Sequence, residues 1–345
     1  MTDTGRSPDT NRSWRLDRRP DSDPADGNLR LHREGLPEIA DGEILVRNVY
    51  LSIDPTHRIW MSDIDQYMDP VELGDVMRGG TIGVVEQTRS SRLSVGDIVT
   101  GQGGWQDYCA LSARMVRKIE LASGLPLTAY MGPLGNIGAT AYFGLLEIGK
   151  PRPGETVVVS AAAGAVGSLV GQIAKLMGCH VVGIAGSDEK CAWLTDDLGF
   201  DASVNYKSGS IYDTLEAACP NGIDVYFDNV GGEILDTALT LINLNARIAT
   251  CGLISTYNDL EQGGQGPKMY RNVLMKRATI RGFIVSDFLR RYPEAFAAIR
   301  HWLRIGALQY RVDVREGLEH APDVLKLLFS GRHDGKLIVK ISEEP

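Results

Sequence analysis

The sequence is poor in cysteine, and the few cysteines it has are scattered. There are five in 345 residues, an odd number, and no two of them form a Cys-x-x-Cys pair. This pattern argues against a disulfide framework and a cysteine-based metal site, and it fits a reducing compartment. The five are Cys109, Cys179, Cys191, Cys219 and Cys251.

Long apolar runs and an excess of positive charge are also missing. No stretch approaches the ~20 apolar residues that span a bilayer, and the polar first residues contain no signal-peptide core. With 36 Lys and Arg against 44 Asp and Glu, the formal net charge is −8. We therefore expect a cytoplasmic protein with no nucleic-acid or membrane partner.

The most informative stretch that is present lies in residues 156–190. A β-branched strand, Thr156-Val-Val-Val-Ser160, leads into a turn with Gly164 and Gly167, then a helical pattern and a second strand at 180–184. This order is typical of the βαβ unit that binds a dinucleotide, with its pyrophosphate at a helix N-terminus. We expect Gly164, Ala165, Val166 and Gly167 to hold that pyrophosphate. Because Ala162 stands at the first glycine position, the pattern is weak by itself, and the glycines could serve helix–strand packing alone.

The end of the second strand indicates which dinucleotide is bound. An NAD-selecting fold usually places an acid there, roughly 20 residues past the glycines, for the ribose 2′-hydroxyl. Here Ala185 and Gly186 occupy the place, and Lys190 follows. A small residue with a nearby cation suits a 2′-phosphate and predicts NADP(H). The plainer alternative is that Lys190 is a solvated lysine on a helix face.

The remaining pattern predicts an α/β fold with two domains. Short strands with glycine and proline turns fill residues 42–116 and indicate an irregular β-rich domain, and a helical pattern follows at 134–146. We expect residues 1–10 to be disordered and a last strand at 335–340 to rejoin the first domain. A doubly wound parallel sheet is expected from strands near 156–160, 180–184, 202–205, 223–228, 246–251 and 279–285, with helices near 165–177, 188–198, 210–218, 232–243 and 293–304.

Several motifs together resemble one enzyme family. They are Leu51-Ser-Ile-Asp-Pro55, Met77-Arg-Gly-Gly80, Thr140-Ala-Tyr-Phe-Gly144, Ser160-Ala-Ala-Ala-Gly-Ala-Val-Gly167, Gly186-Ser-Asp-Glu-Lys190, Phe227-Asp-Asn-Val-Gly-Gly232 and Cys251-Gly-Leu-Ile-Ser-Thr-Tyr257. The chain resembles the zinc-independent branch of the medium-chain dehydrogenase/reductase superfamily, the NADP-dependent alkenal/enone double-bond reductases that include prostaglandin and leukotriene reductases. The resemblance implies a homodimer. It also implies a GroES-like, mainly β catalytic domain over residues 11–139 and 304–345, with a Rossmann domain over 140–303.

Zinc is not expected. Members of the superfamily that hold catalytic zinc carry a Gly-His-Glu motif where this chain has Arg78-Gly79-Gly80. None of the six histidines has a spacing that supplies three zinc ligands.

The resemblance also implies the chemistry. NADPH would deliver hydride to the β-carbon of an α,β-unsaturated aldehyde or ketone, and a donor would stabilise the enolate. A tyrosine O–H suits this role because it stays protonated at neutral pH. We expect Tyr257, after the fifth Rossmann strand, to be the catalytic residue. The alternative is that its hydroxyl only contacts a phosphate or ribose of the cofactor.

Further site residues follow from the resemblance. The cofactor would also contact Tyr206, Asn229, Cys251, Gly252, Leu253, Ile254, Ser255, Thr256, Phe283, Ile284, Val285 and His333, and the substrate Tyr50 and Tyr67. The family has Asn at the position of His333. The histidine could therefore keep this contact with the cofactor, or the contact could be lost. Plain structural roles remain open for the others: a surface tyrosine for Tyr206, a turn for Asn229 and an ordinary core strand for 283–285.

Two other functions remain open. A quinone reductase shares the fold and the lack of zinc, although Gly186–Lys190 and Cys251–Tyr257 favour the alkenal/enone reductase. A non-catalytic NADPH-binding protein belongs to another class, and the intact Tyr257 argues against it.

Overall fold

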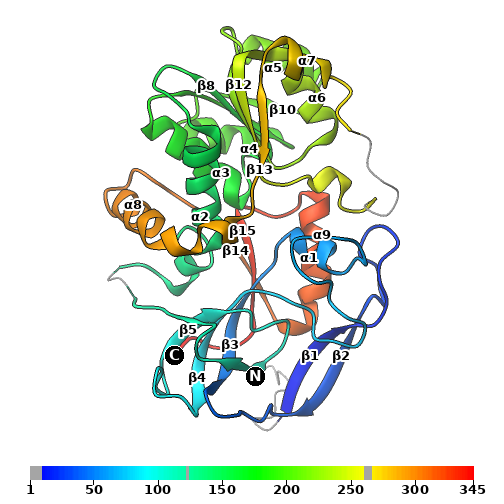
Figure 1. Cartoon of the computed structure of the whole chain (residues 1–345), viewed down its shortest axis with the longest axis vertical. Coiled ribbons are helices and arrows are strands. Elements are labelled where there is room, and N and C mark those ends of the chain that lie inside the picture. Colours follow the sequence, from blue (N-terminus) through cyan, green and yellow to red (C-terminus); the bar gives the residue numbers. More distant parts are fainter. Residues whose placement is uncertain (1–9, 122–123, 260–265) are drawn as a thin grey trace.

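The computed structural model describes residues 10–121, 124–259 and 266–345 and has two parts (Figure 1). One part contains a parallel sheet flanked by helices, and the other a mainly antiparallel sheet. The first described strand, which begins at Thr10, and the C-terminus both lie in the second part. Within the described residues, no helix is long and apolar enough to cross a membrane.

The first part is a doubly wound sheet of six parallel strands in the order β10-β9-β8-β11-β12-β13. This order is that of the Rossmann fold, so the predicted fold class is confirmed. The strands are β8 (Thr156–Val159), β9 (His180–Ala185), β10 (Ala202–Asn205), β11 (Ile223–Asp228), β12 (Ile242–Thr250) and β13 (Thr279–Gly282). The helices of this part include α3 (Ala165–Leu176), α4 (Asp188–Ala192), α5 (Ile211–Ala218), α6 (Gly232–Leu241) and α7 (Arg271–Met275).

The second part is built on a sheet of seven strands, in the order β14-β15-β3-β4-β5-β7, with β6 also paired to β3. Its strands are β3 (Glu43–Ser52), β4 (Thr81–Thr88), β5 (Ile98–Gly101), β6 (Tyr108–Ser112), β7 (Arg117–Lys118), β14 (Val312–Glu316) and β15 (Lys336–Lys340). β15 pairs antiparallel with β3, as expected for the returning chain. A separate pair, β1 (Thr10–Leu16) and β2 (Leu29–Gly35), flanks this sheet.

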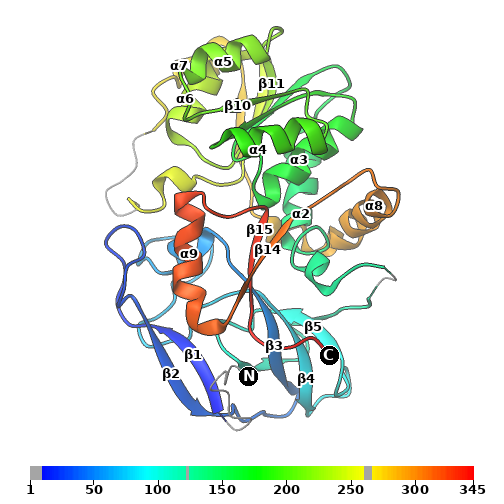
Figure 2. The same cartoon turned by 180° about the vertical axis from the view of Figure 1, so that it is seen from behind.

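Helices connect and cover the two parts. They are α1 (Thr56–Trp60), α2 (Asn136–Phe143), α8 (Tyr292–Arg304) and α9 (Ala321–Ser330). α9 and β15 run close to the boundary between the parts in both views (Figure 2). One apolar cluster contains Val49 and Ile82 of the antiparallel sheet together with Val157 and Phe227 of the parallel sheet. The two parts therefore share one apolar cluster, and each also has apolar clusters of its own.

Three expected boundaries differ from the structure. β13 ends at Gly282, so residues 283–285 follow the sixth strand instead of lying on it. The reason is that β12, with which β13 pairs, ends at Thr250, and the next residue, Cys251, donates its N–H to the carbonyl of Asp228. β12 begins at Ile242, which shortens α6, and Thr10 already belongs to β1. The rest of the segment expected to be disordered, residues 1–9, lies outside the described residues.

Candidate functional site

A cleft of about 1890 Å³ lies between the two parts. The carboxyl ends of β8, β9, β11, β12 and β13 line one wall, and residues 52–56 with the segment before β15 line the other. Single drug-sized ligands fill sites of about 300–1000 Å³. The cleft therefore has room for a dinucleotide and a second molecule.

Most residues singled out from the sequence line this cleft, but their roles stay predictions. The lining ones are Gly164, Ala165, Val166, Gly167, Lys190, Tyr206, Asn229, Cys251, Gly252, Leu253, Ile254, Ser255, Tyr257, Phe283, Ile284, Val285, His333 and Tyr67. Tyr50 and Thr256 are not among the lining residues. Thr256 donates its hydroxyl to the carbonyl of Leu253 within the turn.

The glycine turn before α3 is closely packed. Ala161 takes a left-handed backbone conformation, with φ of 48°. A Cβ on Gly167 would lie 2.4 Å from the Ala161 carbonyl oxygen, so only glycine fits there. Gly164 caps α3 with extended backbone, and the positive end of this helix faces the cleft.

Two lysines and a tyrosine surround the end of β9. A Cβ on Gly186 would lie 3.1 Å from the Tyr206 ring, so a larger residue would press against the tyrosine. Lys190 Nζ donates to the Gly331 carbonyl at 2.8 Å, and Lys207 Nζ lies 5.6 Å from the centre of the Tyr206 ring. Lys207 also lines the cleft and was missed from the sequence, although its place directly after Tyr206 at the end of the third strand was a signal.

Burial affects the charged groups of this corner. Burial lowers the pKa of Lys190, because this lysine is partly desolvated in the cleft. His333 lies beside it, with Nδ1 3.3 Å from the carbonyl oxygen of Leu327. Burial, and secondarily the charge of Lys190, lowers the pKa of His333. At neutral pH the imidazole is therefore uncharged.

Asn229 and Asp228 shape the end of β11. The Asn229 side-chain amide donates to the Ser160 carbonyl at 2.7 Å, which leaves its oxygen for a ligand. Asp228 is fully buried, and its Oδ1 accepts the backbone N–H groups of Val230 and Gly231. Burial raises the pKa of Asp228. This carboxyl holds the turn that leads into α6.

Tyr257 closes the short turn after β12. Its oxygen accepts the Leu253 N–H at 3.1 Å, a bond that leaves the phenolic proton available as a donor. Burial raises the pKa of Tyr257 to about 12, so the hydroxyl stays protonated at neutral pH. Tyr67, across the cleft, bonds to the Thr56 hydroxyl and accepts from Trp60 Nε1 at 3.0 Å.

Tyr50 does not reach the cleft, contrary to expectation. Its side chain is 6% exposed, and its hydroxyl donates to Glu344 at 2.7 Å. Burial and this carboxylate raise the pKa of Tyr50. Side chains alternate between the two faces of a strand, and the register of β3 turns Tyr50 into the core and toward the chain end.

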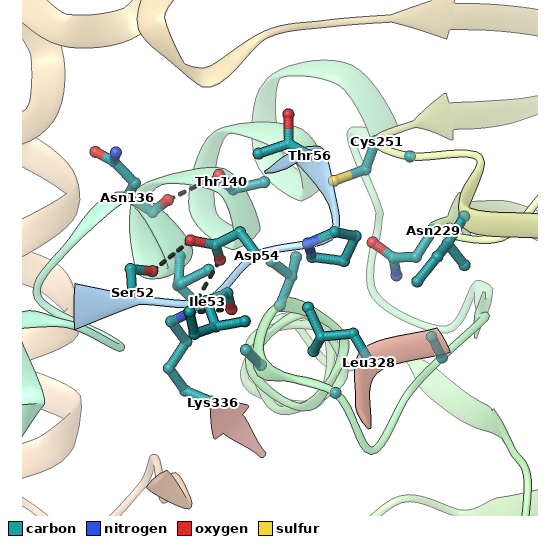
Figure 3. A pocket seen from close by; sticks show the side chains of 18 of the residues that line it. Ser52, Ile53, Asp54, Thr56, Asn136, Thr140, Asn229, Cys251, Leu328 and Lys336 are labelled. Atoms are coloured by element: carbon teal, nitrogen blue, oxygen red, sulfur yellow. Dashed lines mark hydrogen bonds and ion pairs between the residues drawn. The ribbon is translucent and has the colours of Figure 1, made fainter. Parts of the chain in front are cut away.

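An ion pair between a buried lysine, Lys336, and a partly exposed carboxylate, Asp54, lies on the floor of the cleft (Figure 3). Lys336, with its side chain 3% exposed, donates to Asp54 Oδ1 at 2.9 Å and to the Ile53 carbonyl at 2.8 Å. Asp54 also accepts from the Ser52 hydroxyl. Burial opposes the charge of Asp54, yet Lys336 and its other neighbours hold the pKa of this carboxyl below its usual value. No local pattern predicted the pair, because its members are 282 residues apart in the chain.

The segment 331–336 joins these features. At one end the Gly331 carbonyl accepts from Lys190, and at the other Lys336 binds Asp54. Between them Gly335 forms a parallel bridge with Gly164 of the glycine turn. One short segment thus contacts the lysine corner, the glycine turn and the cleft floor.

Within the parts of the chain that the structure describes, no three His, Cys, Asp or Glu side chains are grouped so that they could hold a metal ion.

The chain matches two family models along its length. One, the N-terminal domain of oxidoreductase, matches residues 12–119, and the other, zinc-binding dehydrogenase, matches residues 165–301. The NADPH-dependent curcumin reductase of Escherichia coli is 41% identical over 98% of this chain and 99% of its own. Prostaglandin reductase 1 of Bos taurus is 40% identical over 95% of this chain and 98% of its own.

The fold agrees with these matches. A crystal structure of CurA in complex with NADPH, from Vibrio vulnificus, superposes with a TM-score of 0.90 at 41% identity, covering 96% of this chain and all of that one. The chain belongs to the zinc-independent, NADP-dependent alkenal/enone reductase family of the medium-chain dehydrogenases/reductases.

Proposed function

We propose that this protein reduces the C=C bond of α,β-unsaturated aldehydes and ketones with NADPH. The observation that carries the proposal is the joint lining of one cleft by a protonated tyrosine hydroxyl, Tyr257, and the lysine corner with Lys190 and Lys207. The similarity to a curcumin reductase and to a prostaglandin reductase supports the same activity, and the similarity to CurA in complex with NADPH supports the cofactor.

The cleft suits a phosphorylated dinucleotide. The close approach at Gly167 and the N-terminus of α3 favour a pyrophosphate, because backbone N–H groups and the helix dipole both attract anions. Lys190 and Lys207 would hold the 2′-phosphate, and Gly186 leaves the space that an acid would take. The amide of Asn229 and the backbone of residues 283–285 would hold the nicotinamide end. When bound, NADPH supplies the hydride that reaches the β-carbon.

Tyr257 would act on the substrate. As hydride arrives, negative charge moves to the carbonyl oxygen, and a positioned O–H donor lowers the energy of that charge. The bond from the Leu253 N–H fixes the direction of the Tyr257 hydroxyl, and its high pKa keeps the proton in place. Tyr67 would line the pocket on the opposite side. Tyr257 is therefore our catalytic residue and Tyr67 a substrate contact.

The test is turnover with three substrates. Purified protein is assayed for NADPH oxidation with a short 2-alkenal, a chalcone-like enone and a quinone, and the products are identified by mass spectrometry. We expect saturated carbonyl products from the first two and little reaction with the quinone. Reduction of the quinone alone would replace this proposal with a quinone reductase, and no reaction with any substrate would favour a non-catalytic NADPH-binding protein.

We also propose that the protein is a cytoplasmic homodimer. Residues 279–282 of β13 are all exposed, and this edge strand carries unpaired backbone groups that can pair with another chain. Five free cysteines fit a reducing compartment. Light scattering on wild type and Ile280→Lys, together with cell fractionation, tests both: the wild type should be dimeric, and the variant should shift toward monomer.

The domain boundaries remain our proposal as well: catalytic residues 11–139 and 304–345, and nucleotide-binding residues 140–303. The membership of β15 in the antiparallel sheet supports the return of the chain.

A further inference from the structure

The turn that carries Tyr257 is held on both sides of this residue. Before it, Ser255 bonds to the carbonyl oxygen of Val230 through its N–H at 3.1 Å and through its hydroxyl at 2.6 Å. After it, the side-chain amide of Asn258 donates to the carboxylate of Asp23. Tyr257 therefore lies between two anchors.

The second anchor joins the two parts of the molecule. Asp23 lies in the loop between β1 and β2 of the antiparallel part, and Asn258 follows β12 of the parallel part. Both views show this loop, in blue, beside the yellow turn after β12 (Figures 1 and 2). Asp23, Tyr257 and Asn258 all line the cleft. The contact therefore connects the two walls directly beside the proposed catalytic hydroxyl.

The loop that carries Asp23 is fixed by buried side chains. Arg58, which is 1% exposed, donates from Nε to the carbonyl of Ser22 at 2.8 Å. Asn28, which is 3% exposed, accepts the N–H of Ala25 at 2.6 Å. These bonds hold the chain on both sides of Asp23, so its carboxylate stands on a fixed backbone.

The hydroxyl of Tyr257 depends on the place of its turn. Its oxygen accepts the N–H of Leu253, which belongs to the same turn, at 3.1 Å. A donor stabilises developing charge only within hydrogen-bond distance of the atom that carries it, and a misplacement of about 1 Å can cost about 100-fold in rate. Any movement of the turn therefore moves the donor away from the substrate oxygen.

We propose that Asp23 is a positioning residue for Tyr257. Through Asn258 it holds the turn against the antiparallel part, which sets the hydroxyl relative to the wall that carries Tyr67 and the cleft floor. The bonds of Ser255 set the same turn relative to the nucleotide-binding part. The inference rests on the proposed function, and it adds a residue that acts on the donor from the opposite part of the molecule.

The test swaps the two side chains. Asn258→Asp removes the amide donor and sets a second carboxylate against Asp23, so we expect kcat with a short 2-alkenal to fall about 10-fold, the value of one charge-assisted hydrogen bond. The Kd for NADPH should stay unchanged, because the lysine corner and the glycine turn are untouched. Adding Asp23→Asn to this variant supplies an amide donor from the opposite side, and this swapped variant should recover most of the lost kcat.

Two further variants serve as controls. Asn258→Ala removes the donor without adding a charge, so it should lower kcat less than Asn258→Asp does. Asp21→Asn removes a charge from an exposed residue of the same loop that is not among the lining residues, and it should keep the wild-type kcat. If the swapped variant recovered nothing while Asn258→Ala matched the wild type, the positioning by Asp23 would be overturned.

Deuterium uptake tests the positioning without turnover. In NADPH-bound protein, the amides of residues 253–257 should take up deuterium about 10-fold faster in Asn258→Asp than in wild type, and more slowly again in the swapped variant. This result supports the positioning even if the wild type reduces no enone, an outcome that would overturn only the proposed function. Unchanged uptake in Asn258→Asp would overturn the positioning. A higher kcat in that variant would do the same, because the contact would then limit access to the cleft.

Discussion

The two walls of the cleft are built in different ways. On the parallel-sheet wall, backbone sets the shape: Gly167 has no room for a Cβ, and strand ends present their turns to the ligand. On the antiparallel wall, side chains set the shape: Asp54 and Lys336 form the ion pair on the floor, and Trp60 and Tyr67 are among the lining residues. The parallel-sheet wall therefore suits a ligand that stays the same, the cofactor. The shape of the antiparallel wall can change with single side-chain substitutions.

The largest effect on the contrast between the two walls is expected from removing Lys336, the cation of the antiparallel wall. Lys336→Met leaves Asp54 without its charged partner and should cost up to about 3 kcal/mol of unfolding free energy, because the carboxylate is only partly buried. Lys340→Met, on the same strand but in an exposed pair with Glu343, should cost under about 1 kcal/mol. Chemical denaturation measures both. If Lys336→Met lost as little unfolding free energy as Lys340→Met, the ion pair of Lys336 with Asp54 would not stabilise the cleft floor.

The same pair predicts a dependence on pH. The pKa of Asp54 is lower in the folded protein than in the unfolded chain. Its contribution is therefore fully present above about pH 4 and is lost as the pH falls through the folded value. Asp54→Asn should flatten the decline of unfolding free energy at acid pH, and an unchanged decline would show that other carboxyls dominate.

The catalytic test comes next in size. Tyr257→Phe should lower kcat by about 10²-fold, because it removes the donor to the developing enolate. Since the pKa of Tyr257 is about 12, this group should leave the wild-type kcat flat up to about pH 10. Thermal unfolding should change little. An unchanged kcat would reduce Tyr257 to a cofactor contact.

Adding one methyl group at Gly167 tests whether the backbone sets the shape of the parallel-sheet wall. Gly167→Ala places a Cβ against the Ala161 carbonyl and should cost about 1–3 kcal/mol of unfolding free energy and weaken NADPH binding. Gly35→Ala, where a Cβ meets nothing within 4 Å, is the matched control. Calorimetry and thermal unfolding report both effects. If the two variants behaved alike, the inference that Gly167 leaves no room for a Cβ would be wrong.

The smallest expected effect concerns cofactor choice. Lys190→Ala should raise the KM for NADPH by about 10-fold, the value of one charge-assisted hydrogen bond, with little change for NADH. Lys207→Ala should act in the same direction, more weakly. Lys326→Ala is the control, because that lysine also lines the cleft but is held by Asp26 and Asp323. Equal effects on both nucleotides would remove Lys190 from the phosphate site.

The comparison also explains what the sequence could predict. The strands and helices of the parallel sheet, and the lining residues near them, depend on local patterns such as 156–167, and the structure has them in the expected order. Tyr50 was misplaced because the face of β3 that meets the cleft depends on the distant chain end at Glu344. Asp54 and Lys336 are far apart in the sequence and come together only through tertiary packing. The roles assigned to individual residues stay predictions until the variants are measured.

The segment 331–336 has a consequence for protein engineering. It belongs by sequence to the chain end, yet it touches Lys190 and Gly164 of the nucleotide-binding part as well as the floor. A chimaera that exchanged only residues 140–303 with another reductase would keep this segment and lose the surface it fits. Swaps of cofactor preference between relatives should therefore carry both pieces together.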